Sequence, residues 1–237
     1  MSSIDSDVVL LTCDRGAAGR RRGLRAAGMR RVPTALANVP EVRISANPGR
    51  AEIDPVLAEH RPTRLIVAGC DADLSAVLVR LLRTERLGTT EVAYIPMTRR
   101  SAAAAVWGLP RDPARAAALA LTGTASAVPL IRDDAGGVLV GRGEVRGLRG
   151  EAYCDERLVL RGNVRRLVVA PGPQGVSALP GRGVQAATGR ALQVGCVSAT
   201  VVHDGVAHPR AVTRWTWYRH TSDWLLVTSA CECVTVF

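Results

Sequence analysis

Residues Leu65–Leu74, with the sequence LIVAGCDADL, decide the fold class of this chain. Four apolar residues at 65–68 predict a strand that is buried on both faces, because no polar residue interrupts them. A loop of small and acidic residues follows at 69–73, and apolar residues then recur at helical spacing up to Leu82. A strand, a short loop and an amphipathic helix in this order are typical of a parallel sheet.

Similar segments lie on both sides of this unit. Apolar, β-branched runs predict strands at 8–12 and 91–95. Helical spacing predicts helices at 20–31, 52–60, 74–82, 101–107 and 113–121. We therefore expect residues 1–129 to form a doubly wound α/β domain, with helices on both faces of a parallel sheet.

The pattern changes after Pro129. Helical periodicity ends, and short apolar runs alternate with glycine and proline at 138–140, 157–160, 167–169, 192–202, 212–218 and 224–227. This succession predicts an antiparallel β-sandwich domain over residues 130–227, after which residues 228–237 could return to the first domain. No repeat or low-complexity linker separates the two parts, so we expect them to pack closely.

The composition excludes several classes of chemistry. All 31 basic residues among the 237 are arginine, so a pyridoxal-phosphate Schiff base and a Walker P-loop, which need a lysine, are excluded. The longest uncharged stretch, residues 116–131, is too short to span a bilayer. With scattered cysteines and no secretory signal, we expect a soluble, cytoplasmic protein without a transmembrane segment.

Two loops follow predicted parallel strands, at residues 69–73 and 96–101. Ligands of open parallel sheets bind beyond the carboxyl ends of the strands, and the N–H groups of a following helix can hold a phosphate. The alternative is that both loops are ordinary turns with acidic caps, which local sequence alone favours.

The order of segments across the whole chain resembles the catalytic domain of the diacylglycerol kinase family, a lipid-kinase and NAD-kinase-like fold. LIVAGCDADL resembles the strand–GGDGTL–helix segment of that family. YIPMTRRSAAAAVWGLPRDPARAAALALTG, residues 94–123, is similar to its P-x-G-T-G-N-D-x-A stretch, with Pro96, Ala104, Gly108 and Pro110 at matching positions. VVLLTCDRGAAGRRR, residues 8–22, lies in the place of the N-P-x-S-G loop, and residues 200–227 resemble the closing segment around D-G-E.

The resemblance implies an N-terminal nucleotide-binding-like α/β domain and a C-terminal β-sandwich. It also implies a vestigial nucleotide site whose members are Gly69, Asp71, Asp73, Thr98, Arg99, Arg100 and Ser101. Side chains replace glycines of the family at several of these positions, which crowds the phosphate path and disfavours positive φ. Of the D-G-E motif, Asp204 and Gly205 remain and Val206 replaces the glutamate. Valine cannot act as a base.

Our leading hypothesis is therefore a degenerate diacylglycerol kinase-like protein, catalytically inactive, that serves as a binding or interaction module. Its partner would be an unidentified protein or an anionic small molecule or lipid, and we expect no metal and no cofactor. The alternative is an active lipid kinase that phosphorylates diacylglycerol or a related lipid alcohol. It would use ATP and Mg²⁺, with Asp204 as the catalytic base.

A second alternative is arginine-mediated binding of an anionic surface, either nucleic acid or acidic phospholipid. The densest cluster comprises Arg20, Arg21, Arg22, Arg25, Arg30 and Arg31. A solvated helix face is the simpler interpretation, because arginine is abundant throughout the chain, and nucleic acid is not favoured.

Arg99 and Arg100 stand at the start of a predicted helix, where positive charge is unfavourable without a compensating anion. They could hold an anionic ligand through bidentate guanidinium contacts. We instead expect at least one of them to form a salt bridge with Asp71 or Asp73, which would partly fill the phosphate position.

Three weaker patterns remain. Gly181-x-Gly183-x-x-Ala186 fits a relaxed dinucleotide fingerprint, but it follows Leu179-Pro180 instead of a strand, and we discount it. Cys231 and Cys233, with His203 or His208, lack the paired spacing of a structural metal site. The alternating Trp215, Trp217 and Arg219 could stack nucleic-acid bases, although buried sandwich aromatics are the favoured interpretation.

Overall fold

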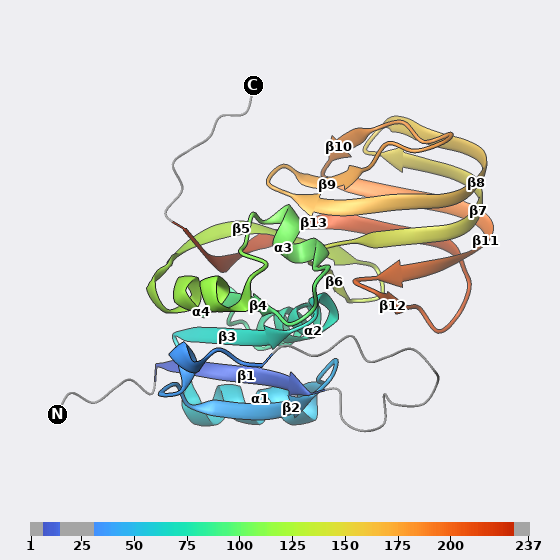
Figure 1. Cartoon of the computed structure of the whole chain (residues 1–237). Helices are drawn as coiled ribbons and strands as arrows, with labels where there is room; N and C mark the ends of the chain where they lie inside the picture. Colours follow the sequence, from blue (N-terminus) through green and yellow to red (C-terminus); the bar gives the residue numbers. More distant parts are fainter. Residues whose placement is uncertain (1–6, 15–30, 230–237) are drawn as a thin grey trace, which may run out of the picture.

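The computed structural model describes residues 7–14 and 31–229. Its N-terminal part contains a parallel sheet in the order β2-β1-β3-β4 (Figure 1). The register places Leu10 of β1 beside Ile66 of β3, and Ile66 beside Ala93 of β4. The strands span Val8–Asp14 (β1), Glu41–Ser45 (β2), Arg64–Gly69 (β3) and Glu91–Pro96 (β4).

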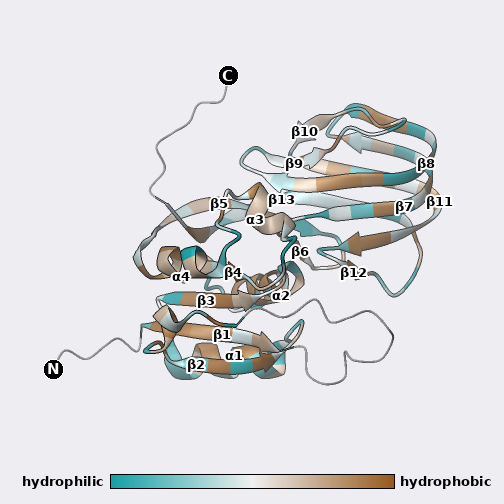
Figure 2. Ribbon diagram, viewed as in Figure 1, coloured by the Kyte–Doolittle hydropathy of each residue, from teal (hydrophilic) through white to brown (hydrophobic). Residues whose placement is uncertain are grey.

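Helices cover both faces of this parallel sheet. Successive strand residues point to opposite faces, so Leu65 and Val67 pack with helices α1 and α2, while Ile66 and Ala68 pack with α4 and the short 3-10 helix η2. In Figure 2 most of β1 and β3 is brown, which reflects this burial on two sides. The helices span Thr34–Leu36 (η2), Arg50–His60 (α1), Asp71–Arg83 (α2), Ala102–Val106 (α3) and Pro113–Thr122 (α4).

The C-terminal part is a β-domain of long, mostly antiparallel strands that curve around a second core (Figure 1). Trp217 is fully buried in this core. The strand order continues as β10-β9-β8-β7-β11-β13, with β12 beside β11, β5 beside β13 and β6 beside β5. These strands span Thr124–Asp133 (β5), Val138–Leu139 (β6), Gly143–Cys154 (β7), Arg157–Gly172 (β8), Gly175–Ala178 (β9), Ala187–Gly189 (β10), Ala191–His203 (β11), Val206–Ala207 (β12) and Val212–Thr228 (β13).

Strand β13 joins the two parts into one continuous sheet. Its first half pairs with β11, and Leu225 and Leu226 in its second half run parallel to β4, beside Glu91 and Val92. Strand β5 pairs with β13 along most of its length. The two parts therefore share backbone hydrogen bonds and are not connected by a linker alone.

The expected α/β arrangement with a β-sandwich is confirmed. Six strands, β2, β5, β7, β9, β10 and β12, were not predicted, and the patterns divided β8 and β13 into two pieces each. The helix predicted at 20–31 lies mostly outside the described residues, as do Cys231 and Cys233. Among the described residues, no helix is both long and apolar enough to cross a bilayer.

Candidate functional site

Asp71 is the first residue of α2 and lies directly after β3 and Cys70. Its carboxylate is buried and accepts four hydrogen bonds. Oδ1 accepts from the hydroxyl of Tyr94 at 2.9 Å and from that of Ser101 at 2.5 Å, and Oδ2 accepts from the backbone N–H groups of Ala102 at 2.7 Å and Ala103 at 3.2 Å. Both oxygens of Asp71 are thus fully occupied within the protein.

These contacts place Asp71 at the N-terminal end of α3. The first N–H groups of a helix lack partners inside the helix and carry partial positive charge, so a carboxylate there is stabilising. Ser101 is the N-cap and accepts from the N–H of Ala104 at 2.9 Å. The helix end that the resemblance would offer to a phosphate therefore already holds an anionic group of the chain itself.

Asp73 has a similar role two residues further along α2. Its Oδ2 accepts from the N–H of Cys70 at 2.7 Å, which forms part of a capping box, and its Oδ1 accepts from the N–H of Asn47 at 2.7 Å. A Cβ atom at Gly69 would lie 2.6 Å from that Oδ2. Gly69 is therefore required for close packing against the Asp73 cap.

Asp204 follows β11, and its carboxylate is fully buried. Oδ1 accepts from the N–H groups of Gly141 and Arg142, both at 2.8 Å, and Oδ2 accepts from that of Val140 at 2.9 Å. Burial raises the pKa of Asp204 to about 7, while the three backbone N–H groups oppose that shift and the charge of Asp71 adds to it. The side chain fixes the 140–142 loop, where no solvent reaches it.

Gly141 connects the two buried acids. A Cβ atom at this position would lie 2.5 Å from the backbone nitrogen of Ala103, whose N–H donates to Asp71. The loop held by Asp204 thus packs directly against the start of α3. Asp71 and Asp204 stabilise the same junction between the α/β part and the β-domain.

His203, beside Asp204, belongs to the same buried junction. Its Nε2 lies 3.2 Å from Oδ2 of Asp133, and its Nδ1 lies 3.6 Å from Oδ2 of Asp204. Burial lowers the pKa of His203, and the charge of Asp133 opposes that effect. From the sequence, His203 was a candidate only for a metal ligand. The adjacent His-Asp pair at the end of a long β-strand was the signal that could have located this cluster.

The predicted salt bridge between Arg99 or Arg100 and Asp71 or Asp73 is wrong. Within residues 7–14 and 31–229 neither arginine forms an ion pair, and both side chains are exposed. The physical reason is that every carboxylate oxygen already accepts a hydrogen bond within the protein: two hydroxyls and two backbone N–H groups donate to Asp71, and two backbone N–H groups donate to Asp73. Water can compensate the exposed guanidinium groups, whereas buried donors at helix ends require an acceptor.

The absence of glycine from the 98–101 loop also has a physical reason. Among the described non-glycine residues only Asn47, Arg61, Glu85, Asp155 and Asp204 have positive φ, so the loop contains no left-handed residue. Cys70 is likewise extended, with φ of −97°. Side chains at these positions therefore cause no backbone strain, because neither loop uses the positive φ that glycine adopts more readily than other residues.

The remaining sequence candidates lie elsewhere. Trp215 and Trp217 are buried in the β-domain core, as the favoured interpretation predicted, and Arg219 pairs with Asp223 at 3.4 Å. Gly181 and Gly183 form a tight turn between β9 and β10 and precede no helix. In the described part of the chain, no cluster of three or more His, Cys, Asp or Glu side chains could hold a metal ion.

The doubly wound α/β part joined to a curved β-domain is the fold of solved diacylglycerol kinase and NAD kinase structures. A crystal structure of a diacylglycerol kinase from Bacillus anthracis str. Sterne is similar, with a TM-score of 0.66 and 11% identity, covering 97% of this chain and 99% of that one. An NAD kinase from Archaeoglobus fulgidus in complex with ATP gives a TM-score of 0.59 at 13% identity, covering 94% of each chain.

No family model and no curated protein matches the sequence. At 11–13% identity the structural likeness establishes the fold, which the chain shares over nearly its whole length.

Proposed function

We propose that this chain is a catalytically inactive protein with a lipid-kinase fold that serves as a binding or interaction module. The observation that carries the proposal is the position of Asp71. The resemblance would place this carboxylate at the nucleotide, but it is buried and accepts four hydrogen bonds from Tyr94, Ser101, Ala102 and Ala103. A carboxylate in this state has no free lone pair directed at a ligand.

Asp204 supports the same proposal. A general base must reach the proton that it removes, within about 3 Å or through one water. The side chain of Asp204 is fully buried, and three backbone N–H groups hold it against the 140–142 loop. Exposing it to a lipid hydroxyl would require that loop to open.

ATP and Mg²⁺ do not fit the residues at this position. Mg²⁺ binds through carboxylates with free oxygens, and both oxygens of Asp71 are occupied. Asp73 is buried, and its carboxylate caps the start of α2. The neighbouring loop carries the side chains of Thr98, Arg99 and Arg100 at positions where the backbone itself would have to approach the phosphate. We therefore derive no phosphoryl-transfer step through ATP.

A second candidate function is an active lipid kinase, and one observation favours it. The pKa of Asp204 is raised to about 7, which is the range of an efficient general base, and the charge of Asp71 contributes to that shift. In this alternative Asp204 would accept the proton of a hydroxyl group of diacylglycerol or a related lipid alcohol.

Two measurements separate the candidates. Folded protein is incubated with radiolabelled ATP, Mg²⁺ and an extracted lipid pool, and we expect no label in the lipid fraction. ATP is also titrated calorimetrically into the wild-type chain and into Asp71→Asn, a variant that retains one acceptor oxygen. Label transfer, or sub-millimolar ATP binding that Asp71→Asn removes, would overturn the proposal and favour the kinase.

A further inference from the structure

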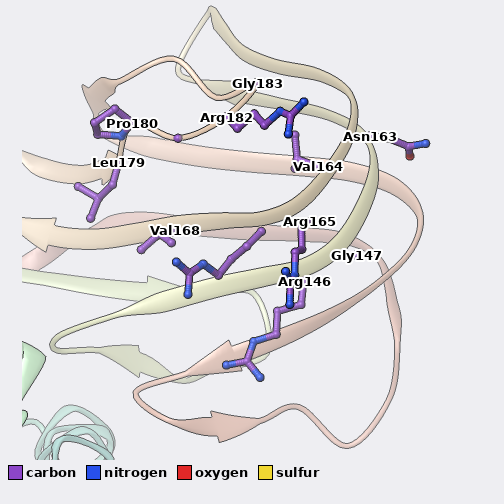
Figure 3. Close-up of a pocket in the computed structure, with 12 residues that line it drawn as sticks. Arg146, Gly147, Asn163, Val164, Arg165, Val168, Leu179, Pro180, Arg182 and Gly183 are labelled. Carbon is purple, nitrogen blue, oxygen red and sulfur yellow. The ribbon is translucent and has the colours of Figure 1, made fainter.

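A groove of about 1280 Å³ opens on the β-domain, between strands β7 and β8 and the loop that follows β9 (Figure 3). Strand β7 contributes Arg146, strand β8 contributes Arg165 and Arg166, and the loop contributes Leu179 and Arg182. We call this feature the arginine groove. Its lining includes neither Asp71 nor Asp204, so it is separate from the junction that those two residues stabilise.

Positive charge is concentrated in the arginine groove. Four of its described lining residues are arginines, and none of them is acidic. In Figure 3, Arg146 and Arg165 lie on neighbouring strands, and Arg182 extends from the loop between β9 and β10. The guanidinium groups thus come from three different segments of the chain and gather around one concave surface.

Among the described residues, Glu144 provides the only carboxylate that pairs with the arginines of the groove. Arg146 and Arg166 are directly opposite each other on β7 and β8, an arrangement in which like charges repel. Both pair with Glu144, at 2.7 Å and 3.7 Å, and Arg142 pairs with the same carboxylate at 2.9 Å. A single negative charge is therefore shared by three guanidinium groups.

Arg165 and Arg182 have no such compensation. Neither forms an ion pair with any residue in 7–14 or 31–229, and both side chains are exposed. The groove therefore retains a surplus of positive charge that the described residues leave unbalanced. Anions bind where such charges converge on one concave surface.

The other lining residues define the kind of anion. The described lining contains no aromatic side chain on which nucleic-acid bases could stack, and no hydroxyl, thiol or imidazole that could act as a nucleophile. Val168, Leu179 and Pro180 add an apolar wall beside the guanidinium groups. A concave, bounded site of this composition suits a compact anion more than a nucleic-acid strand.

We propose that the arginine groove binds a compact ligand that carries two or more phosphate groups. Each guanidinium can hold a phosphate through two parallel N–H···O bonds, and Arg165 and Arg182 have free donors for this contact. The same chemistry is present in a free polyphosphate and in a multiply phosphorylated lipid headgroup. The arginine groove would be the ligand site of the proposed binding module. Phosphate binding in the groove does not depend on whether the protein has kinase activity.

The test uses inorganic tripolyphosphate as the probe, titrated calorimetrically into the full chain at low salt. We expect saturable binding that weakens as salt is raised, and a Kd at least roughly tenfold higher in R165E/R182E, because two charge-assisted contacts become repulsive. The matched control is R83E/R115E, which changes the net charge by the same amount at two exposed arginines of the other domain that form no ion pair with a described residue. An equal loss in both double variants, or no binding by the wild type, overturns the proposal.

Two further arms identify the source of the phosphates. Sedimentation with phosphatidylcholine vesicles, with and without a bisphosphorylated inositol lipid, tests the headgroup. Retention only with that lipid, reduced in R165E/R182E, assigns the groove to a membrane headgroup, and tripolyphosphate binding without retention assigns it to a free ligand. Tighter binding to duplex DNA than to tripolyphosphate, lost in the same variant, would overturn the compact-ligand proposal in favour of nucleic acid.

ATP itself carries a triphosphate, so the ATP titration is repeated with R165E/R182E. ATP binding that disappears in this variant and persists in Asp71→Asn belongs to the arginine groove and leaves the proposed inactivity intact. ATP binding that persists in R165E/R182E and disappears in Asp71→Asn contradicts the inactive-kinase proposal. The tripolyphosphate titration then remains the test of the arginine groove.

Discussion

The phenol of Tyr94 donates a hydrogen bond to the carboxylate of Asp71 across 2.9 Å, and burial raises the pKa of that phenol well above its usual value. Tyr94 lies on β4 and Asp71 begins α2, so the bond connects two neighbouring βα units at the carboxyl edge of the sheet. This edge is where ligands of open α/β sheets bind. In this chain, contacts between the protein's own polar groups fill it.

We expect the Asp71 contacts to stabilise the fold measurably. Asp71→Ala leaves four donors without their acceptor and should lower the free energy of unfolding by about 1–3 kcal/mol. Asp71→Asn should cost less, because its amide oxygen can still accept from Ala102 and Ala103. Tyr94→Phe, which removes the hydroxyl that contacts Asp71 and the carbonyl oxygen of Gly69, should cost about 1 kcal/mol. Urea unfolding followed by circular dichroism measures all three, and an Asp71→Ala variant as stable as the wild type would contradict the structural role.

Gly69 provides a second test of whether this loop serves packing or a ligand. In Gly69→Ala the new Cβ would lie 2.6 Å from Oδ2 and 2.9 Å from Cβ of buried Asp73, so the capping box must distort. We expect a loss of about 1–3 kcal/mol, the usual cost of overpacking. Gly88→Ala is the matched control, because its Cβ would meet nothing within 4 Å. Equal stability of the two variants would show that the loop adapts freely.

Asp204 gives stability a distinct pH dependence. Its pKa is about 7 in the folded chain and 3.8 as the reference value, so the native state binds the proton more tightly than the unfolded state. Its contribution is fully present below about pH 4 and is lost as pH rises through 7, with a slope of up to about 1.4 kcal/mol per pH unit. Asp204→Asn should remove this component.

The measurement is the difference in unfolding free energy between the wild type and Asp204→Asn from pH 4 to pH 8. Burial lowers the pKa of His203, so His203 contributes with the opposite sign. Because its Nδ1 lies 3.6 Å from Asp204, the comparison is repeated in a His203→Gln background, in which the imidazole no longer titrates. A difference that stays constant across the whole range would contradict the raised pKa.

The parallel sheet was predictable because burial on two faces leaves an unbroken apolar run, as at residues 65–68. Strand β2 was missed because only Ile44 among its residues is buried, which leaves little apolar pattern. Strands β8 and β13 were divided because polar residues at exposed positions interrupt a continuous backbone ladder. Strands also form backbone hydrogen bonds at positions whose side chains are exposed and polar, and the hydropathy pattern does not indicate a strand at those positions.

The site residues were located by the resemblance, but their contacts were not predictable from pattern. Opposite charges at Asp71 and Arg99 suggested an ion pair, whereas backbone N–H groups at the start of α3 are the actual partners. Sequence shows side-chain charge and not which backbone donors need an acceptor. The arginine groove was missed because Arg146, Arg165 and Arg182 converge only through the pairing of β7 with β8 and the turn after β9.

Restoring glycines to the loop at residues 98–101 should not be enough to create an ATP site. The G-T-G-N sequence of the family can be introduced into this loop by four substitutions, Thr98→Gly, Arg99→Thr, Arg100→Gly and Ser101→Asn. We expect no saturable ATP binding up to roughly 1 mM, the upper end of usual substrate affinities. Glycine widens the accessible φ range, but Asp71 still occupies the N-terminal end of α3, where a phosphate would need the same N–H groups.

The titration is carried out in the R165E/R182E background, so that a triphosphate cannot bind the arginine groove. Circular dichroism and thermal unfolding establish that the grafted chain is folded. Adding Asp71→Asn to the graft removes the negative charge that competes with phosphate at the start of α3. We expect this addition to raise the ATP affinity more than the graft alone does, because the carboxylate, and not the loop sequence, excludes phosphate. Sub-millimolar ATP binding by the graft alone would show the reverse: loss of the loop glycines would then be what closed the site.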